Sequence, residues 1–223
     1  MEASPLVSTV LFRIGPIGIT GPVVTTWGIV LALAGMSWLA TRRLPQRVDA
    51  RHSLAEIAVL ALLDHFSAII GKDARPLLPL LGTLFIFLVV ANLSSIVPGL
   101  EAPTAKLETP AALALIVFFS VHYFGIRAQG FLGYLASFAR PKVIMLPLNL
   151  LSEITRTFSL MVRLFGNVMS GEFIIALILA LAGLFVPIPF MALEILLGLV
   201  QAYIFTVLAT VFIGAAIDTA ARS

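Results

Sequence analysis

The stretch SLMVRLFGNVMSGEF, residues 159–173, places Arg163, Asn167 and Glu172 in a segment that long apolar runs flank on both sides. An arginine at mid-membrane costs about 2.5–3.5 kcal/mol on insertion scales, so intramembrane charges usually mark a functional site. A fold that holds this stretch must therefore give Arg163 either a charged partner or a polar path.

The composition predicts an all-α integral membrane protein with a single domain. The chain has 223 residues, of which 60% are hydrophobic and 11% are charged, whereas soluble domains are about 25% charged. Its mean hydropathy is +1.10. The absence of cysteine excludes disulfides and thiolate metal sites. The net charge of +3 comes mostly from short connections between apolar runs, so we expect membrane lipid rather than nucleic acid as a partner.

The apolar runs predict about five membrane-crossing helices. We place them at 23–40, 77–97, 111–124, 143–184 and 190–217. The fourth run would be about 63 Å long as one helix, although a hydrocarbon core is only about 30 Å thick. We therefore expect it to lie steeply inclined or to break at Gly166 and Asn167. The arrangement that we favour is a strongly tilted hairpin of the last two helices, joined by a proline-containing turn.

A shorter segment, 53–70, carries Glu56, Asp64 and His65 among apolar residues at helical spacing. This pattern predicts an amphipathic helix that lies at the membrane interface. The alternative is a short sixth span.

The charges of the connections predict the orientation in the membrane. The connection 125–142 holds Arg127, Arg140 and Lys142 without an acid, whereas 98–110 holds Glu101, Lys106 and Glu108. The connection 41–76 is also rich in basic residues: Arg42, Arg43, Arg47, Arg51, Lys72 and Arg75. Because basic loops stay in the cytoplasm, we expect the N-terminus outside and the C-terminus inside.

Arg163, Asn167 and Ser170 share one helical face, since they stand at positions i, i+4 and i+7. This face predicts a fixed cation beside a water-filled path or a charged partner. The alternative is a structural ion pair of Arg163 with Glu153 or Glu172.

The following helix has a polar face of its own, formed by Glu194 and Gln201. Gly198 stands between them and allows close helix approach. In an antiparallel hairpin, Glu172 and Glu194 reach a similar level and Gln201 lies closer to Arg163. Chance placement of interfacial acids is the alternative.

A second polar group, Asn149, Glu153 and Arg156, stands earlier on the long fourth run. It predicts either an aqueous entrance from the cytoplasmic side or an interfacial ion pair between Glu153 and Arg156. The chain shows no P-loop, no dinucleotide-binding glycine pattern and no H-E-x-x-H motif. We therefore expect no cofactor, no metal and no nucleotide chemistry on this chain, which would not be catalytic by itself.

The segment SLMVRLFGNVMSGE closely resembles the signature of subunit a of F-type ATP synthases, the membrane stator that faces the rotating c-ring. Further matches are ANLSSIVPG at 91–99, LSEITRTFSLMVRLFGN at 151–167 and LGLVQAYIFTVLATVFIG at 197–214. The resemblance covers roughly residues 53–218.

This resemblance implies two offset aqueous half-channels that pass protons, or sodium ions, to and from carboxylates of the c-ring. Arg163 would separate the half-channels, with Asn167 and Gln201 as polar partners. Glu172 and Glu194 would be the ionisable pair of the outer half-channel, although many relatives have histidine in place of Glu194. The inner half-channel would include Asn149, Glu153 and Ser170.

The resemblance also implies partners and a location. The partners would be the c-ring and the b-type subunits of the peripheral stalk, and the location a bacterial inner membrane. Two other classes of protein compete with this interpretation. A self-contained ion channel or secondary transporter would enclose its binding site within the chain, and an intramembrane enzyme would need a nucleophile–base pair or metal ligands.

Overall fold

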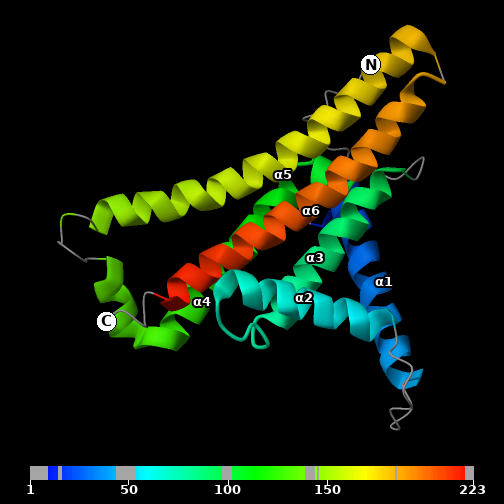
Figure 1. Ribbon diagram of the computed structural model, residues 1–223. Helices are drawn as coiled ribbons and strands as arrows, with labels where there is room; N and C mark the ends of the chain where they lie inside the picture. Colours follow the sequence, from blue (N-terminus) through cyan, green and yellow to red (C-terminus); the bar gives the residue numbers. More distant parts are fainter. Residues whose placement is uncertain are drawn as a thin grey trace.

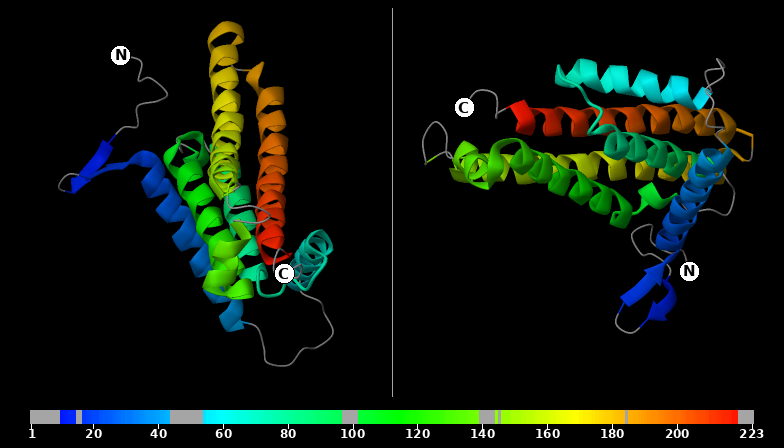
Figure 2. Two further views of the ribbon diagram at one scale, coloured as in Figure 1. Left: turned by 90° about the vertical axis from the view of Figure 1, so that its left-hand side faces the viewer. Right: turned by 90° about the horizontal axis from the view of Figure 1, so that it is seen from below.

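The computed structural model describes residues 10–14, 17–43, 54–96, 102–138, 144, 146–183 and 185–218. Over these ranges the chain is an all-α membrane protein, whose helices Figure 1 labels, with a small N-terminal β-hairpin that is visible in Figure 2. The helices are α1 (Gly21–Arg43), α2 (Leu54–Ile70), α3 (Leu78–Leu93), α4 (Glu108–Phe138), α5 (Leu146–Ala182) and α6 (Pro187–Asp218). Arg47, Arg51, Ser53, Glu101, Arg140 and Lys142, which entered the sequence predictions, lie outside these ranges.

In the described ranges, α1, α4, α5 and α6 are long and apolar enough to cross a membrane. Helix α3 has 16 residues and continues into the 3₁₀ turn η1 (Ser94–Ile96). Together they extend about 30 Å, the thickness of a hydrocarbon core. This architecture agrees with the predicted all-α membrane fold.

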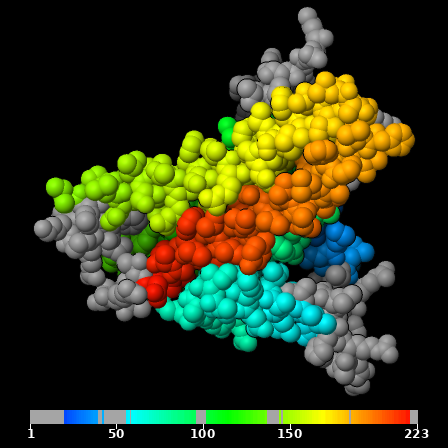
Figure 3. Space-filling model, turned by 45° about the horizontal axis from the view of Figure 1, so that its top comes forward, coloured from blue at the N-terminus to red at the C-terminus, as the bar shows by residue number. Residues whose placement is uncertain are grey.

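Helix α6 forms the centre of the bundle and packs against α2, α3, α4 and α5. Its inner face presents Phe205, Ala209 and Ile213, which are fully buried against Leu81 and Leu88 of α3. In the space-filling view of Figure 3, α6 lies between α5 and α2. Helix α1 and the hairpin extend away from this bundle (Figure 2).

The last two helices form the expected hairpin, and α5 is unbroken at Gly166 and Asn167. A glycine inside a helix costs only about 1 kcal/mol relative to alanine, which the long apolar flanks outweigh. The chain reverses at Gly183, whose φ of 80° suits glycine alone, and α6 begins at Pro187. Figure 1 shows α5 and α6 side by side near this turn and diverging toward their other ends. Their tilt in a membrane stays a prediction.

Helix α4 runs further than the predicted span 111–124, because the segment that we expected to be a basic connection is helical to Phe138. Gly130 interrupts this helix with φ 74° and ψ 161°. The segment beyond Gly130 turns so that the Tyr134 ring packs on Gly125, where a Cβ would overlap the ring. This turn carries Tyr134 toward α5.

The hairpin of β1 (Val10–Ile14) and β2 (Ile17–Thr20) was not predicted. Its strands pair antiparallel, and the Thr20 hydroxyl donates to Oε2 of Glu108 at 2.7 Å. The sequence signal was present, since both strands carry β-branched residues and Gly-Pro lies between them.

Helix α2 buries Phe66 and exposes Glu56, Asp64 and His65. Its His65 Nε2 lies 2.7 Å from the Tyr203 hydroxyl of α6. This two-sided character fits the amphipathic helix that the sequence predicts, but its place at the interface stays a prediction.

Candidate functional site

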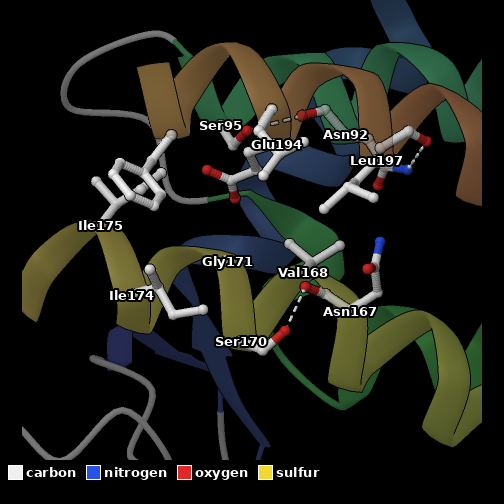
Figure 4. A pocket seen from close by; sticks show the side chains of 13 residues that line it. Asn92, Ser95, Asn167, Val168, Ser170, Gly171, Ile174, Ile175, Glu194 and Leu197 are labelled. Carbon is white, nitrogen blue, oxygen red and sulfur yellow. Dashed lines mark hydrogen bonds between the residues drawn. The ribbon is translucent and has the colours of Figure 1, made fainter. Parts of the chain in front are cut away.

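A cavity of about 90 Å³ lies between α5 and α6 near the hairpin turn and reaches the end of α3. We call it the outer pocket; Figure 4 shows its lining. The lining residues are Asn92, Ser95, Asn167, Val168, Ser170, Gly171, Ile174, Ile175, Phe190, Leu193, Glu194, Leu197 and Gly198. Its polar groups are amides, hydroxyls and the Glu194 carboxyl.

Glu194 projects from α6 toward α5 in this pocket (Figure 4). A Cβ at Gly171 would lie 3.0 Å from Oε1 of Glu194, so a larger residue at position 171 would force the carboxyl to shift by a few tenths of an ångström. Within the described part of the chain, that Oε1 is buried and has no hydrogen-bond partner. A carboxyl held this way is suited to exchange a proton or cation with water in the pocket.

Asn167 and Ser170 also line the outer pocket, and the Ser170 hydroxyl donates to the Asn167 carbonyl at 2.9 Å. The structure thus does not bring Ser170 together with Asn149 and Glu153, with which the resemblance grouped it. Glu172 is half-buried on α5 and is not among the lining residues.

A buried polar group on the α3 side of the outer pocket escaped the sequence reasoning. The Asn92 amide donates from Nδ2 to the Gly198 carbonyl of α6 at 2.8 Å. Its Oδ1 accepts from the Thr104 hydroxyl at 2.9 Å. The signal was a lone asparagine in an apolar helix, a residue that rarely lies buried without partners.

A second cavity, of about 200 Å³, lies where the turned end of α4 meets α5 and α6, and we call it the inner pocket. It is lined by Val121, Gln129, Tyr134, Asn149, Ser152, Glu153, Arg156, Phe212, Ala215 and Ala216. The polar group that the sequence suggested is therefore assembled in one cavity. Arg156 lies 3.5 Å from Glu153 and 4.6 Å from the centre of the Phe212 ring. The ion pair that the sequence offered as one interpretation occurs here, within a cavity that has polar lining. The other interpretation, an aqueous entrance from the cytoplasmic side, stays a prediction.

Arg163 lies on the exposed side of α5, between the two pockets along the helix. Within the described ranges it forms no salt bridge, and Glu153 is paired with Arg156 instead. The structural ion pair of Arg163 with Glu153 is thus absent. Among the residues that the structure describes, no acid therefore neutralises this guanidinium.

Small residues surround Arg163 on the same exposed face of α5, which we call the α5 stripe. Because successive members are three or four residues apart, these residues fall on one side of the helix over about 27 Å. The stripe consists of Ser152, Thr155, Ser159, Arg163, Gly166 and Ser170, all exposed. Only 11% of the apolar membrane-length segment of α5 is buried within the chain, whereas 39% of the corresponding segment of α6 is buried.

Gln201 of α6 is buried, and its Nε2 has no hydrogen-bond partner in the described part of the chain. Counting along the antiparallel helices from the Gly171–Glu194 contact places Gln201 level with Leu164, next to Arg163. The sequence argument placed Gln201 at this level. Nε2 of Gln201 forms no hydrogen bond with Arg163.

The fold and these pockets define a multi-pass helical membrane protein with a polar seam between its last two helices. Comparison with known proteins makes the class specific. Residues 23–214 match the sequence profile of the ATP synthase A chain family. The chain therefore belongs to this family and is a membrane-sector subunit of an ATP synthase.

Individual relatives agree along the whole chain. It is 71% identical over 222 residues, 100% of both chains, to ATP synthase subunit a 2 of Bradyrhizobium sp. strain BTAi1. It is 44% identical over 216 residues, 96% of both chains, to ATP synthase subunit a 1 of Chlorobaculum parvum. It is 45% identical over 209 residues, 94% of this chain and 92% of the relative, to ATP synthase subunit a 2 of Pelobacter propionicus.

Proposed function

We propose that this chain is the stator of a rotary ATP synthase membrane sector and forms two offset half-channels beside a c-ring. The half-channels pass protons, or sodium ions, to and from carboxylates on the ring, and Arg163 separates them. The outer half-channel runs through the outer pocket at Glu194. The inner one runs through the inner pocket at Asn149 and Glu153.

The observation that carries this proposal is the position of Arg163 in the middle of the exposed α5 stripe. Small side chains on a membrane helix let a second helix approach closely. An arginine on such a face would be costly against lipid, by about 2.5–3.5 kcal/mol on insertion scales. A partner helix that brings a carboxylate to Arg163 removes that cost, as a ring of carboxylate-bearing helices would.

The chemistry follows from this arrangement. A ring carboxylate can cross lipid only when a proton or a bound cation neutralises it. Beside Arg163 the carboxylate is stable as the anion and so releases its ion to one half-channel. Arginine suits this role because it stays protonated even when it is desolvated. The membrane potential contributes about 2.3 kcal/mol per charge per 100 mV.

The two pockets supply the offset that a rotary mechanism needs. Asn149 and Glu153 precede Arg163 on α5, whereas Asn167 and Ser170 follow it. In this proposal, an ion that enters through one pocket leaves through the other only after it has bound a ring carboxylate and the ring has rotated past Arg163. In this proposal Ser170 belongs to the outer half-channel. Glu172 lies two residues after Ser170 on α5, close to this half-channel.

We assign the remaining surfaces to the other parts of the complex. The b-type subunits of the peripheral stalk hold the chain against rotation. The chain lies in a bacterial inner membrane, with the N-terminus outside and the C-terminus in the cytoplasm.

The decisive experiment replaces Arg163 with alanine in the whole ATP synthase and measures ATP-driven ion pumping and ATP synthesis in membrane vesicles. We expect both to be lost while the subunits still assemble. Arg75→Ala is the matched control, because the Arg75 side chain is 77% exposed and lies only 3.8 Å from Asp73 in a surface pair. Normal coupled pumping by Arg163→Ala would overturn the proposal. Coupled transport by the purified chain alone would favour a self-contained transporter.

A further inference from the structure

The most specific polar contact between α3 and α6 lies outside the residues to which the stator proposal gives a role. Asn92 is 5% exposed, and Thr104, its partner, is fully buried. Asn92 Nδ2 donates to the Gly198 carbonyl, and Thr104 donates to Asn92 Oδ1. The hydrogen bond from Thr104 to Oδ1 thus orients the asparagine amide with its NH₂ group toward α6.

The place of this contact on α6 matters. Gly198 stands four residues after Glu194 and three before Gln201. A Cβ at Gly198 would lie 3.0 Å from Cβ of Asn92, so α3 and α6 approach more closely here than a larger residue at position 198 would allow without a shift. The hydrogen bond therefore restrains α6 from sliding along α3 at a point between Glu194 and Gln201.

The same group also reaches α5. Thr104 belongs to the 3₁₀ turn η2 (Pro103–Ala105), which packs against α5. Ala102 and Ala105 form a buried cluster with Val168, which lines the outer pocket. A continuous path of contacts thus leads from Val168 through η2 and Asn92 to Gly198.

We propose that Asn92 is a positioning residue that sets the register of α6 against α5 and thereby holds the Glu194 carboxyl opposite Gly171. The role given to Glu194 rests on the proposed function, but the register itself does not. Asn92 acts here through the helix backbone, and ions need not bind it.

The test uses the fact that the chain has no cysteine of its own. Gly171→Cys and Glu194→Cys are introduced together, and disulfide formation with an added Cu(II)–phenanthroline oxidant is measured in membranes that contain the whole complex. Passive ion flux through membranes stripped of the nucleotide-binding sector is measured separately, with residues 171 and 194 intact.

Asn92→Leu keeps the size of the side chain but removes both hydrogen bonds. We expect it to lower the disulfide yield and to slow the flux roughly tenfold, as the loss of a buried hydrogen bond would. Thr104→Val removes only the donor to Oδ1 and should move both readouts in the same direction by less. Thr104→Ser keeps the hydroxyl and should leave both near the parent values.

The outcomes separate the alternatives. Slower flux with an unchanged disulfide yield would overturn the proposal and place Asn92 directly in the ion path. Unchanged flux and yield would overturn it as well. If Asn92→Leu fails to assemble, the comparison of Thr104→Val with Thr104→Ser decides. The disulfide yield does not depend on ion transport and therefore tests the helix register by itself. A failure of the stator proposal would appear in the Arg163→Ala experiment instead, so the two failures can be told apart.

Discussion

Gly171 and Glu194 meet across the α5–α6 hairpin so closely that a Cβ on the glycine would lie 3.0 Å from Oε1 and 3.1 Å from Cδ of the carboxyl group. The acid therefore occupies the space that a larger side chain on α5 would fill. Its position between the helices depends on a residue whose only contribution is its small size. The role of the outer pocket in ion flux can therefore be tested by adding a single methyl group at position 171.

Gly171→Ala should slow ion flux through the outer pocket, because the added methyl must displace the Glu194 carboxyl by a few tenths of an ångström. A displacement that costs about 1 kcal/mol corresponds to a roughly fivefold loss of rate. The measurement is passive ion flux through membrane sectors without the nucleotide-binding part.

Gly82→Ala serves as the matched control for this variant. Both glycines lie inside helices, and both alanines gain about 1 kcal/mol of helix propensity, but a Cβ at Gly82 meets nothing within 4 Å. Equal effects of the two substitutions would show that contact with Glu194 is irrelevant.

Glu194→Gln should slow ion entry from the outer side more than it harms assembly, because an amide cannot take up and release a proton at this position. Glu172→Gln should act in the same direction but less strongly, since Glu172 does not line the outer pocket. Initial rates of passive flux, started from either side of the membrane, measure the effect.

Glu56→Gln is the control, since Glu56 is exposed on α2 and far along the chain from both pockets. Unchanged flux in Glu194→Gln would remove the carboxyl from the ion path.

The helical fold could be predicted from the sequence, because an apolar segment of membrane length must pair its backbone N–H and C=O groups internally, and an α-helix does this. The helix positions and the polar residues on α5 and α6 follow from composition and periodicity. The extension of α4 was missed, since Arg127 and Gly130 resemble a loop until Gln129 is seen donating to the Ala216 carbonyl at 2.9 Å. Local sequence does not show where a helix ends when a contact with another helix stabilises its last turns.

The candidate site was predictable in part for the same reason. Arg163, Glu194 and Gln201 are conspicuous, because charged and polar groups are expensive in an apolar helix. Asn92 and Gly171 are not, because their roles depend on contacts between helices whose register the sequence does not give. Ser170 lines the outer pocket rather than the cavity that holds Asn149 and Glu153, because helical spacing sets its face but not its distance from either cavity.

Single cysteines should reveal two pockets that open to opposite sides of the membrane. Ser152→Cys lies in the inner pocket and Ser170→Cys in the outer pocket. A membrane-impermeant thiol reagent should label the first only from the cytoplasmic side and the second only from the other side. Labelling is measured by mass spectrometry on inside-out and right-side-out vesicles.

Leu177→Cys is the matched control, because Leu177 is exposed on α5 but lines neither pocket. It should stay unlabelled from both sides, because neither pocket brings water to position 177. Labelling of both serine positions from one side alone would contradict the proposed offset of the half-channels.

The α5 stripe provides the last prediction. Ser159→Trp and Gly166→Trp should weaken association with the c-ring, because an indole in place of a small side chain keeps the partner helices from approaching α5 closely. Recovery of the c-ring with the tagged chain after mild detergent extraction measures the effect, and we expect a loss of at least about tenfold for a contact worth 1.4 kcal/mol or more.

Phe158→Trp is the matched control for the α5 stripe. Phe158 is also exposed on α5, at 60%, but it points to another side of the helix than Ser159 and Gly166. Phe158→Trp should leave the c-ring attached to the chain, because an aromatic side chain already occupies that side of α5. If all three tryptophan variants retain the c-ring equally, the exposed face around Arg163 is not where the rotating partner binds.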